Sequence, residues 1–119
     1  MVLRKVKIEN YTFGSVKIDG KEFKSDLIIY PDRVDDKWWR REGHLLQMED
    51  LTAVFACKPD VLIVGRGLPG LMKVDGKVEG HCRLNNIKLI VRPTSQAVDE
   101  YNRWAAINQK VVACLHLTC

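Results

Sequence analysis

The residues of this chain whose spacing is closest to a known chemical motif are three glycines in the stretch VLIVGRGLPG, residues 61–70. Gly65, Gly67 and Gly70 follow four apolar residues and have the GxGxxG spacing of turns that bind the pyrophosphate of a dinucleotide. Such a turn needs a helix that begins inside it, because the free amides of that helix hold the phosphates. Here the first plausible helix start is Asp75, about five residues too late.

The acidic residue that would bind the ribose is also absent. It is expected about 20 residues after the glycines, at the end of the next strand, where this chain has Val91, Arg92 and Pro93. Arginine suits the 2′-phosphate of NADP, so an NADP site remains an alternative. The motif is explained better as a glycine-rich turn where a buried strand leaves the sheet, and we expect no cofactor.

A site for a small anion is a further interpretation of the same region. Ligands of open α/β sheets bind outside the carboxyl ends of parallel strands, where the turns at 65–70 and 92–95 are expected to lie. The second turn opens a helix whose free amides favour an anion, and nearby arginines would add charge-assisted hydrogen bonds. The residues of this hypothetical site are Gly65, Arg66, Gly67, Thr94 and Ser95.

The stretch DDKWWRREGH, residues 35–44, concentrates tryptophan, arginine, acidic residues and one histidine. One or both tryptophans are expected to anchor the segment to the core, since an aromatic side chain can bury a large apolar area. Arg40, Arg41 and Glu42 are expected to form a local ion-pair network. The alternative is a surface that recognises another protein, because tryptophan and arginine are enriched at binding hot spots. Its residues would be Trp38, Trp39, Arg40, Arg41 and His44.

The remaining histidines, cysteines and aspartates follow no clear motif. His44 has no Cys or Ser partner nearby in the sequence and is interpreted as a structural, hydrogen-bonded residue. On the final strand Cys114 and His116 would face the same side, and Cys119 adds a thiol, so a thiol–imidazole site or a metal site can be considered. Strand spacing is poor for tetrahedral zinc, so we expect no metal ligand and no catalytic residue. The following aspartates are interpreted as turn residues and a solvated face: Asp26, Asp32, Asp35 and Asp36.

The composition limits the kind of protein to which these residues belong. With 119 residues, 46% hydrophobic and 29% charged, the chain can form one compact domain, expected to span residues 1–119. The net charge is +4, but basic and acidic residues are mixed along the chain, so nucleic-acid binding is not indicated. No apolar run approaches the ~18 residues of a membrane span and no signal-peptide pattern occurs. We therefore expect a cytoplasmic protein without membrane contact and with its four cysteines reduced.

The elements that must position these residues follow from periodicity. An antiparallel hairpin is expected over residues 1–25, with its turn at Asp19-Gly20. Strands are expected at 26–30, 61–64, 88–91 and 110–117, and helices from Glu49 to Pro59, from Asp75 to Asn86 and from Thr94 or Ser95 onwards. Strands joined by helical crossovers lie largely parallel. The expected fold is α/β, a single layered domain with a mixed β-sheet and helical crossovers, in which the N-terminal antiparallel hairpin lies in the sheet or in a layer against it.

Four blocks of the sequence resemble a known family. They are WWRREGH, VLIVGRG, PTSQAVDEYN and LHLTC, in that order, and the similarity runs from Tyr11 to Cys119. The family is the Mth-type domain of unknown function, first seen in a methanogen protein. Its animal members include the adipogenesis-associated domain protein, and it has more distant mitochondrial relatives among the assembly factors of respiratory complex I.

The resemblance implies a layered α/β domain with a mixed sheet and no established enzyme activity. It implies a non-catalytic binding or assembly module with an unknown protein partner. Two alternatives remain: a small-anion or nucleotide-binding protein or enzyme that uses the glycine turn, and a homodimer formed through a sheet edge or the tryptophan surface. The segment DGKVEGHCRLNN departs from the family pattern, because Gly76 and Gly80 weaken its helix.

Overall fold

The N-terminal residues form the antiparallel hairpin that the sequence predicts, extended to three strands. The computed structural model describes residues 6–108 and 110–119, so the part of the hairpin prediction that falls on residues 1–5 lies outside the described residues. Asp19 and Gly20 join the second strand to the third with φ of 49° and 81°, the left-handed backbone of a two-residue type I′ turn. The strands pair in the order β1 (Ile8–Thr12), β2 (Ser15–Ile18) and β3 (Lys21–Phe23).

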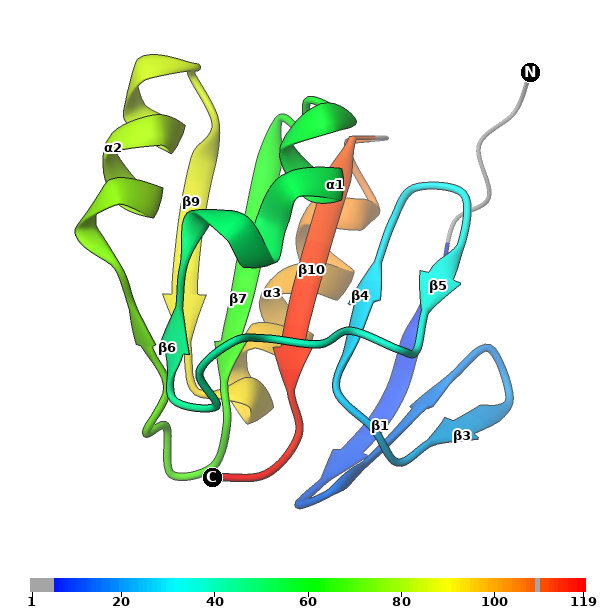
Figure 1. The fold of residues 1–119 in the computed structure, drawn as a ribbon. Helices are drawn as coiled ribbons and strands as arrows, with labels where there is room; N and C mark the ends of the chain where they lie inside the picture. Colours follow the sequence, from blue (N-terminus) through cyan, green and yellow to red (C-terminus); the bar gives the residue numbers. More distant parts are fainter. Residues whose placement is uncertain (1–5, 109) are drawn as a thin grey trace.

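Five further strands form a mixed sheet (Figure 1). In spatial order they are β5 (Val34–Asp35), β4 (Leu27–Ile29), β10 (Val111–His116), β7 (Val61–Arg66) and β9 (Lys88–Arg92). Strands β7, β9 and β10 are parallel, as the helical crossovers predict, whereas β4 runs antiparallel to β10. The mixed character of this sheet therefore comes from β4 and β5, while the hairpin forms a layer of its own.

The helices occur where the sequence predicts them, but the cap of the last helix differs. Asp75 caps the second helix by accepting a hydrogen bond from the Lys77 amide at 3.0 Å. The N-cap of the last helix is Pro93, not Thr94 or Ser95 as predicted, because the Thr94 hydroxyl bonds elsewhere. The helices are the 3-10 turn η1 (Met48–Leu51), α1 (Thr52–Ala56), α2 (Gly76–Leu84) and α3 (Thr94–Ala105).

Both faces of the five-stranded sheet are covered, which explains why its central strands are continuous apolar runs. On one face, Ile63 and Leu115 pack in a core shared with α3 and the hairpin layer. On the other face, Val64 and Cys114 pack in a core shared with α1 and α2. Figure 1 shows α3 behind the sheet and α1 in front of it.

The hairpin layer is tied to α3 by one polar side chain. Asn102 accepts the Ile8 N–H at 2.9 Å through Oδ1 and donates from Nδ2 to the Ile8 carbonyl at 2.8 Å. Both backbone groups of Ile8 are therefore satisfied by a helix side chain in place of a neighbouring strand.

Three short strands have no counterpart in the elements expected from the sequence. β6 (Leu45–Leu46) pairs in parallel with β8 (Lys73–Val74), and each of them spans two residues, as β5 does. A strand of this length has no detectable period, so the sequence does not predict it. Within residues 6–108 and 110–119, no helix is long and apolar enough to cross a membrane.

Candidate functional site

A buried polar cluster of Asp26, Arg40 and His116 lies at the edge of the sheet where β10 ends. The His116 Nδ1 atom is 2.7 Å from Asp26 Oδ2, and the Arg40 Nη1 atom is 2.9 Å from the same oxygen. The Leu117 amide donates to the other carboxylate oxygen at 2.8 Å. Because the side chains of Arg40 and His116 are only 5% and 7% exposed, these polar groups are held inside the protein.

The strand register explains how these distant residues meet. β4 and β10 are antiparallel with Leu27 opposite Leu115, so Asp26, which precedes β4, lies beside the end of β10. Arg40 comes from the crossing segment, residues 36–44, which connects β5 to β6 and passes in front of β4 and β10 (Figure 1). The prediction that Asp26 is a turn residue on a solvated face is wrong, because its carboxylate binds two buried side chains.

Hydrogen bonding determines the charge of Asp26. Burial would raise the pKa of this carboxyl, but hydrogen bonds from His116, the Leu117 amide and Arg40 lower the pKa to about 2. The carboxylate is therefore ionised, and His116 donates its Nδ1 proton to it. The opposite ring nitrogen of His116, Nε2, is buried and has no hydrogen-bond partner among the residues that the structure describes, and the same is true of Arg40 Nε.

The crossing segment buries one tryptophan and presents the other. The Trp38 indole donates to the Asp50 carbonyl at 3.1 Å and packs against the core, whereas Trp39 is 77% exposed. The Arg41 amide donates to the Asp50 carboxylate at 3.1 Å. The predicted anchoring of the segment by a tryptophan is therefore confirmed for Trp38.

Arg40 does not belong to the exposed surface. Its guanidinium turns inward to Asp26 and also donates to the Gly43 carbonyl at 3.0 Å. The expected local network of Arg40, Arg41 and Glu42 is therefore wrong, since the carboxylate partner of Arg40 comes from the start of β4. Sequence reasoning missed this pairing because 14 residues separate the two side chains and no periodic element connects them.

Where the glycine turn meets the start of α3, the amides of Gly67 and Thr94, which could bind a phosphate, are already hydrogen-bonded within the protein. The Gly67 amide donates to the Thr94 hydroxyl at 2.8 Å, and that hydroxyl donates to the His116 carbonyl at 2.6 Å. The Thr94 amide donates to the Gly67 carbonyl at 3.0 Å. A side chain at Gly65 would place its Cβ 2.8 Å from the Thr94 hydroxyl, so this close approach requires glycine. The late helix start at Asp75 is confirmed by α2.

The five residues of the hypothetical anion site converge only in part. The amides of Gly67 and Thr94 donate to each other's residue, and the Thr94 hydroxyl donates to the His116 carbonyl of β10. Arg66 donates from Nε to the Met72 carbonyl at 2.7 Å, and Ser95 is exposed on α3. This arrangement leaves few free donors for an anion at the end of β7.

His44 has a thiol partner that the sequence does not reveal. Cys119 Sγ lies 3.9 Å from His44 Nε2, and the His44 ring meets the His116 ring edge-on with centroids 5.9 Å apart. The Leu71 amide donates to the Cys119 carbonyl at 3.0 Å and holds this backbone in place. Cys114 shares a face of β10 with His116, as predicted, but it is fully buried. Among the described residues, no three His, Cys, Asp or Glu side chains converge as a metal ion would require.

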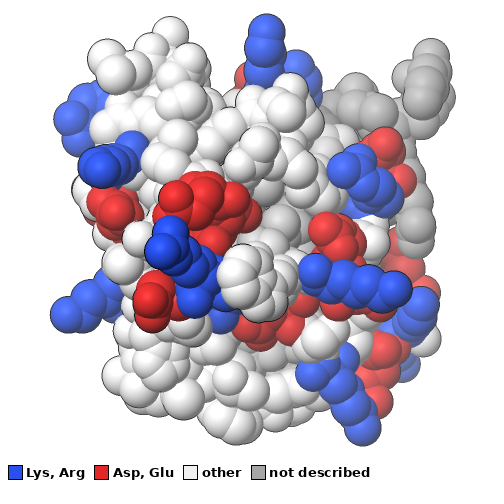
Figure 2. Space-filling view, viewed as in Figure 1, with Lys and Arg blue, Asp and Glu red and all other residues white. Residues whose placement is uncertain are grey.

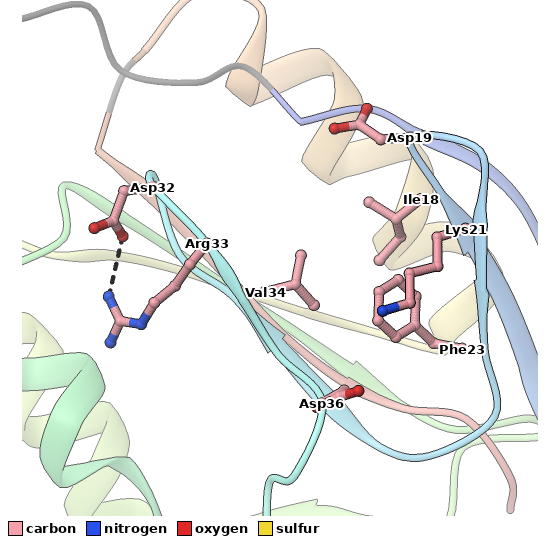
Figure 3. A pocket seen from close by; sticks show the side chains of 8 residues that line it. All are labelled: Ile18, Asp19, Lys21, Phe23, Asp32, Arg33, Val34 and Asp36. Atoms are coloured by element: carbon pink, nitrogen blue, oxygen red, sulfur yellow. Dashed lines mark hydrogen bonds and ion pairs between the residues drawn. The ribbon is translucent and has the colours of Figure 1, made fainter.

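A cavity of about 430 Å³ lies between the β2–β3 hairpin and the β4–β5 turn (Figure 3). Its charged groups are largely engaged, since Arg33 donates to Asp32 at 3.0 Å and the Lys21 ammonium lies 5.1 Å from the Phe23 ring centre. Three other cavities of about 370 to 510 Å³ adjoin the helices. None of these four is lined by the glycine turn or by the polar cluster, so they do not provide the deep pocket there that ligand chemistry would favour.

The surface over the crossing segment carries charges of both signs. Figure 2 shows basic and acidic side chains next to one another on this face, with no continuous patch of one sign. A nucleic-acid backbone binds to a continuous positive surface. This face does not offer one.

Comparisons with known proteins identify the same fold. A family model described as "Protein of unknown function (DUF498/DUF598)" matches residues 8–116. The conserved hypothetical protein PH1505 from Pyrococcus horikoshii OT3 is 31% identical, covers 95% of this chain and 99% of its own, and gives a TM-score of 0.78. A protein named MT938 is 24% identical, with 96% of this chain and 99% of that chain covered and a TM-score of 0.77.

A more distant structure carries the name of the fold. A protein from Bordetella pertussis, described as a Mth938-like domain, is 17% identical, with 93% of this chain and 85% of that chain covered and a TM-score of 0.56. These comparisons confirm the predicted α/β architecture and the family-level resemblance. The link to adipogenesis and to complex I assembly stays a prediction from the resemblance.

Proposed function

Because this chain belongs to the DUF498/DUF598 family of proteins of unknown function, we propose that it is a non-catalytic binding or assembly module that recognises a protein partner. The sequence resemblance to the adipogenesis-associated domain protein, and more distantly to assembly factors of complex I, supports a role of this class. The observation that carries the proposal is the exposed indole of Trp39 on the crossing segment.

Trp39 has the physical properties of a binding hot spot. The residue is 77% exposed, and an indole that enters a partner's pocket removes roughly 150–250 Å² from water. Tryptophan and arginine are the residues that most often dominate the energy of such contacts. Arg41, two positions further on, is also exposed. The fitting partner therefore has an apolar pocket for the indole and an acidic side chain beside it.

The backbone on both sides of Trp39 is fixed before any partner arrives. Trp38 and the Arg41 amide both bond to Asp50, and the Arg40 side chain is buried in the polar cluster. A side chain presented from a fixed backbone loses less conformational freedom when it binds. This arrangement supports recognition through a preformed surface.

The alternative of a small-anion or nucleotide site at the glycine turn has less support. The donors of Gly67 and Thr94 are engaged within the protein. The four described cavities lie elsewhere. The engaged donors favour a partner surface over ligand chemistry.

Affinity capture from the native host at low salt tests the proposal, with Trp39→Ala and Arg41→Ala as test baits. Leu84→Ala is the matched control, because Leu84 is 85% exposed but lies on α2. We expect a partner that wild type and the Leu84 variant recover to be lost with Trp39→Ala and reduced with Arg41→Ala. A photo-crosslinking residue at position 39 should join that partner directly. Equal recovery with all four baits would show that another surface is used.

A second copy of the chain is the partner that must be distinguished from other proteins. Light scattering on the purified chain measures the oligomeric state of wild type and of Trp39→Ala. A wild-type dimer that becomes a monomer in the variant would show that the Trp39 surface binds a second copy of the chain. A monomer in both cases would show that the partner of this surface is a different protein.

A further inference from the structure

Three of the four cysteines are held in an unreactive state. Burial raises the pKa of the Cys114 thiol and that of Cys82, the latter to about 11. Burial also raises the pKa of Cys57, whose thiol donates to the Val54 carbonyl of its own helix. Because the thiolate is the reactive form of cysteine, these three side chains are poor nucleophiles.

Cys119 has different surroundings. It is partly exposed, and its Sγ atom lies 3.9 Å from Nε2 of His44, which is itself exposed. The chain here is fixed, because the Leu71 amide donates to the Cys119 carbonyl and the Leu68 amide donates to the Thr118 carbonyl. A proton acceptor therefore lies beside the thiol, and the thiol is accessible from solvent. Hydrogen bonds already hold the backbone that carries it.

A buried nitrogen without a partner among the described residues belongs to the His116 ring, against which His44 packs. Since Asp26 binds Nδ1 of His116, the ring edge with Cδ2 and Nε2 is turned away from that carboxylate. A Cβ built on Gly67 would lie 2.7 Å from His116 Cδ2 and 3.0 Å from the Cys119 carbonyl carbon, so this ring edge and the Cys119 backbone adjoin one point. The His116 side chain is 7% exposed, and its Nε2 atom is the unpartnered one. The His44 ring packs edge-on against it.

We propose that Cys119 is a site of thiol–disulfide exchange with small peptide disulfides, with His44 as the proton acceptor. The Cys119 thiol gives its proton to His44 Nε2, and its sulfur attacks one sulfur of the disulfide. A new S–S bond to Cys119 forms as the old S–S bond breaks, and the leaving thiolate takes the proton from His44. One disulfide is consumed and one is formed, so the exchange needs no other oxidant.

The exchange proposed for Cys119 does not require the partner proposed for Trp39. No local signal indicates the pairing of Cys119 with His44, because 75 residues separate them. The two are brought together only when the crossing segment and the end of β10 reach the same edge of the sheet (Figure 1).

Reaction of the full chain with oxidised glutathione, followed by mass mapping of the mixed disulfides between about pH 6 and pH 9, tests the proposal. We expect Cys119 to react at least about tenfold faster than any other cysteine, and this preference should vanish in denaturant. Cys57→Ser is the matched control, because Cys57 is also partly exposed, and it should leave the rate unchanged. Cys119→Ser should remove the fast reaction.

His44→Asn tests the role of the imidazole. Because His44 is exposed, the variant should keep its melting temperature while the Cys119 reaction slows by about tenfold and its pH profile changes. The proposal is overturned if Cys57 reacts as fast as Cys119 in the folded chain. It is also overturned if the His44 variant reacts at the wild-type rate across the whole pH range.

Discussion

The His116 imidazole and the Asp26 carboxylate, 90 residues apart in the sequence, meet at 2.7 Å inside the protein. Asp26 precedes β4 and His116 ends β10, so this contact fastens the two antiparallel strands at one end. Arg40 joins from the crossing segment. Three separate parts of the chain therefore depend on one carboxylate.

Asp26→Asn should destabilise the fold by about 3–5 kcal/mol, because it leaves the Arg40 guanidinium buried without its counterion. Asp32→Asn is the matched control. Asp32 also binds an arginine at 3.0 Å, but both side chains are more than half exposed, so its loss should change stability by less than about 1 kcal/mol. Urea unfolding measures both free energies, and equal effects would contradict the role assigned to Asp26.

The same carboxyl predicts how stability depends on pH. Burial raises the pKa of Asp26, but hydrogen bonds from His116, the Leu117 amide and Arg40 outweigh burial and lower it from 3.8 to about 2. Because the pKa of Asp26 is lower in the folded state than in the unfolded state, the ionised carboxylate stabilises the fold. This stabilisation is fully present at pH values above the unfolded-state pKa. That stability, roughly 2 kcal/mol, is lost as the pH falls towards about 2. The difference in unfolding free energy between wild type and Asp26→Asn should therefore shrink between about pH 6 and pH 2.5, and a constant difference would contradict the assignment.

Thr94→Val removes the hydroxyl that links the Gly67 amide to the His116 carbonyl. The change leaves a buried donor and a buried acceptor unsatisfied, and it should cost about 1–3 kcal/mol. Thr94→Ser keeps the hydroxyl and is the matched control. Thermal unfolding should place the valine variant clearly below the serine variant, and a valine variant as stable as wild type would rule out a stabilising bridge.

Two glycines should respond to alanine with opposite signs. Gly67 has φ +96°, and a Cβ there would collide with the Thr118 carbonyl and the His116 ring, so Gly67→Ala should lose about 2 kcal/mol or more. Gly80 lies within α2 with nothing near its would-be Cβ, so Gly80→Ala should gain about 0.5–1 kcal/mol. Guanidinium unfolding measures both variants. Loss in the Gly80 variant, or tolerance in the Gly67 variant, would contradict the packing described here.

Local signals in the sequence account for most elements of the fold. Asp19-Gly20 predicts a hairpin turn because both positions adopt left-handed backbone, and the turn is confirmed. The apolar run at 61–64 predicts a strand covered on both faces, as β7 is. The start of α2 is confirmed as well, since capping by Asp75 depends only on residues next to it.

The polar cluster depends on relationships that no local signal carries. The sequence places Asp26 on a solvated face, but the pairing of β4 with β10 decides its neighbours, and such a register is set by long-range packing. Thr94 has the position of a helix cap, yet its hydroxyl is taken by the end of another strand. Cys119 and His44 are neighbours only through the arrangement of the whole sheet edge.

The Asn102 amide has a consequence for how the protein behaves at high concentration. A strand edge with free N–H and carbonyl groups is a template on which further chains add and fibrils grow. At Ile8 both groups are already bound by a side chain from α3. The Asn102 side chain of α3 therefore prevents another chain from pairing with β1 at Ile8. The residue that gives this protection against aggregation lies 94 residues further along the sequence.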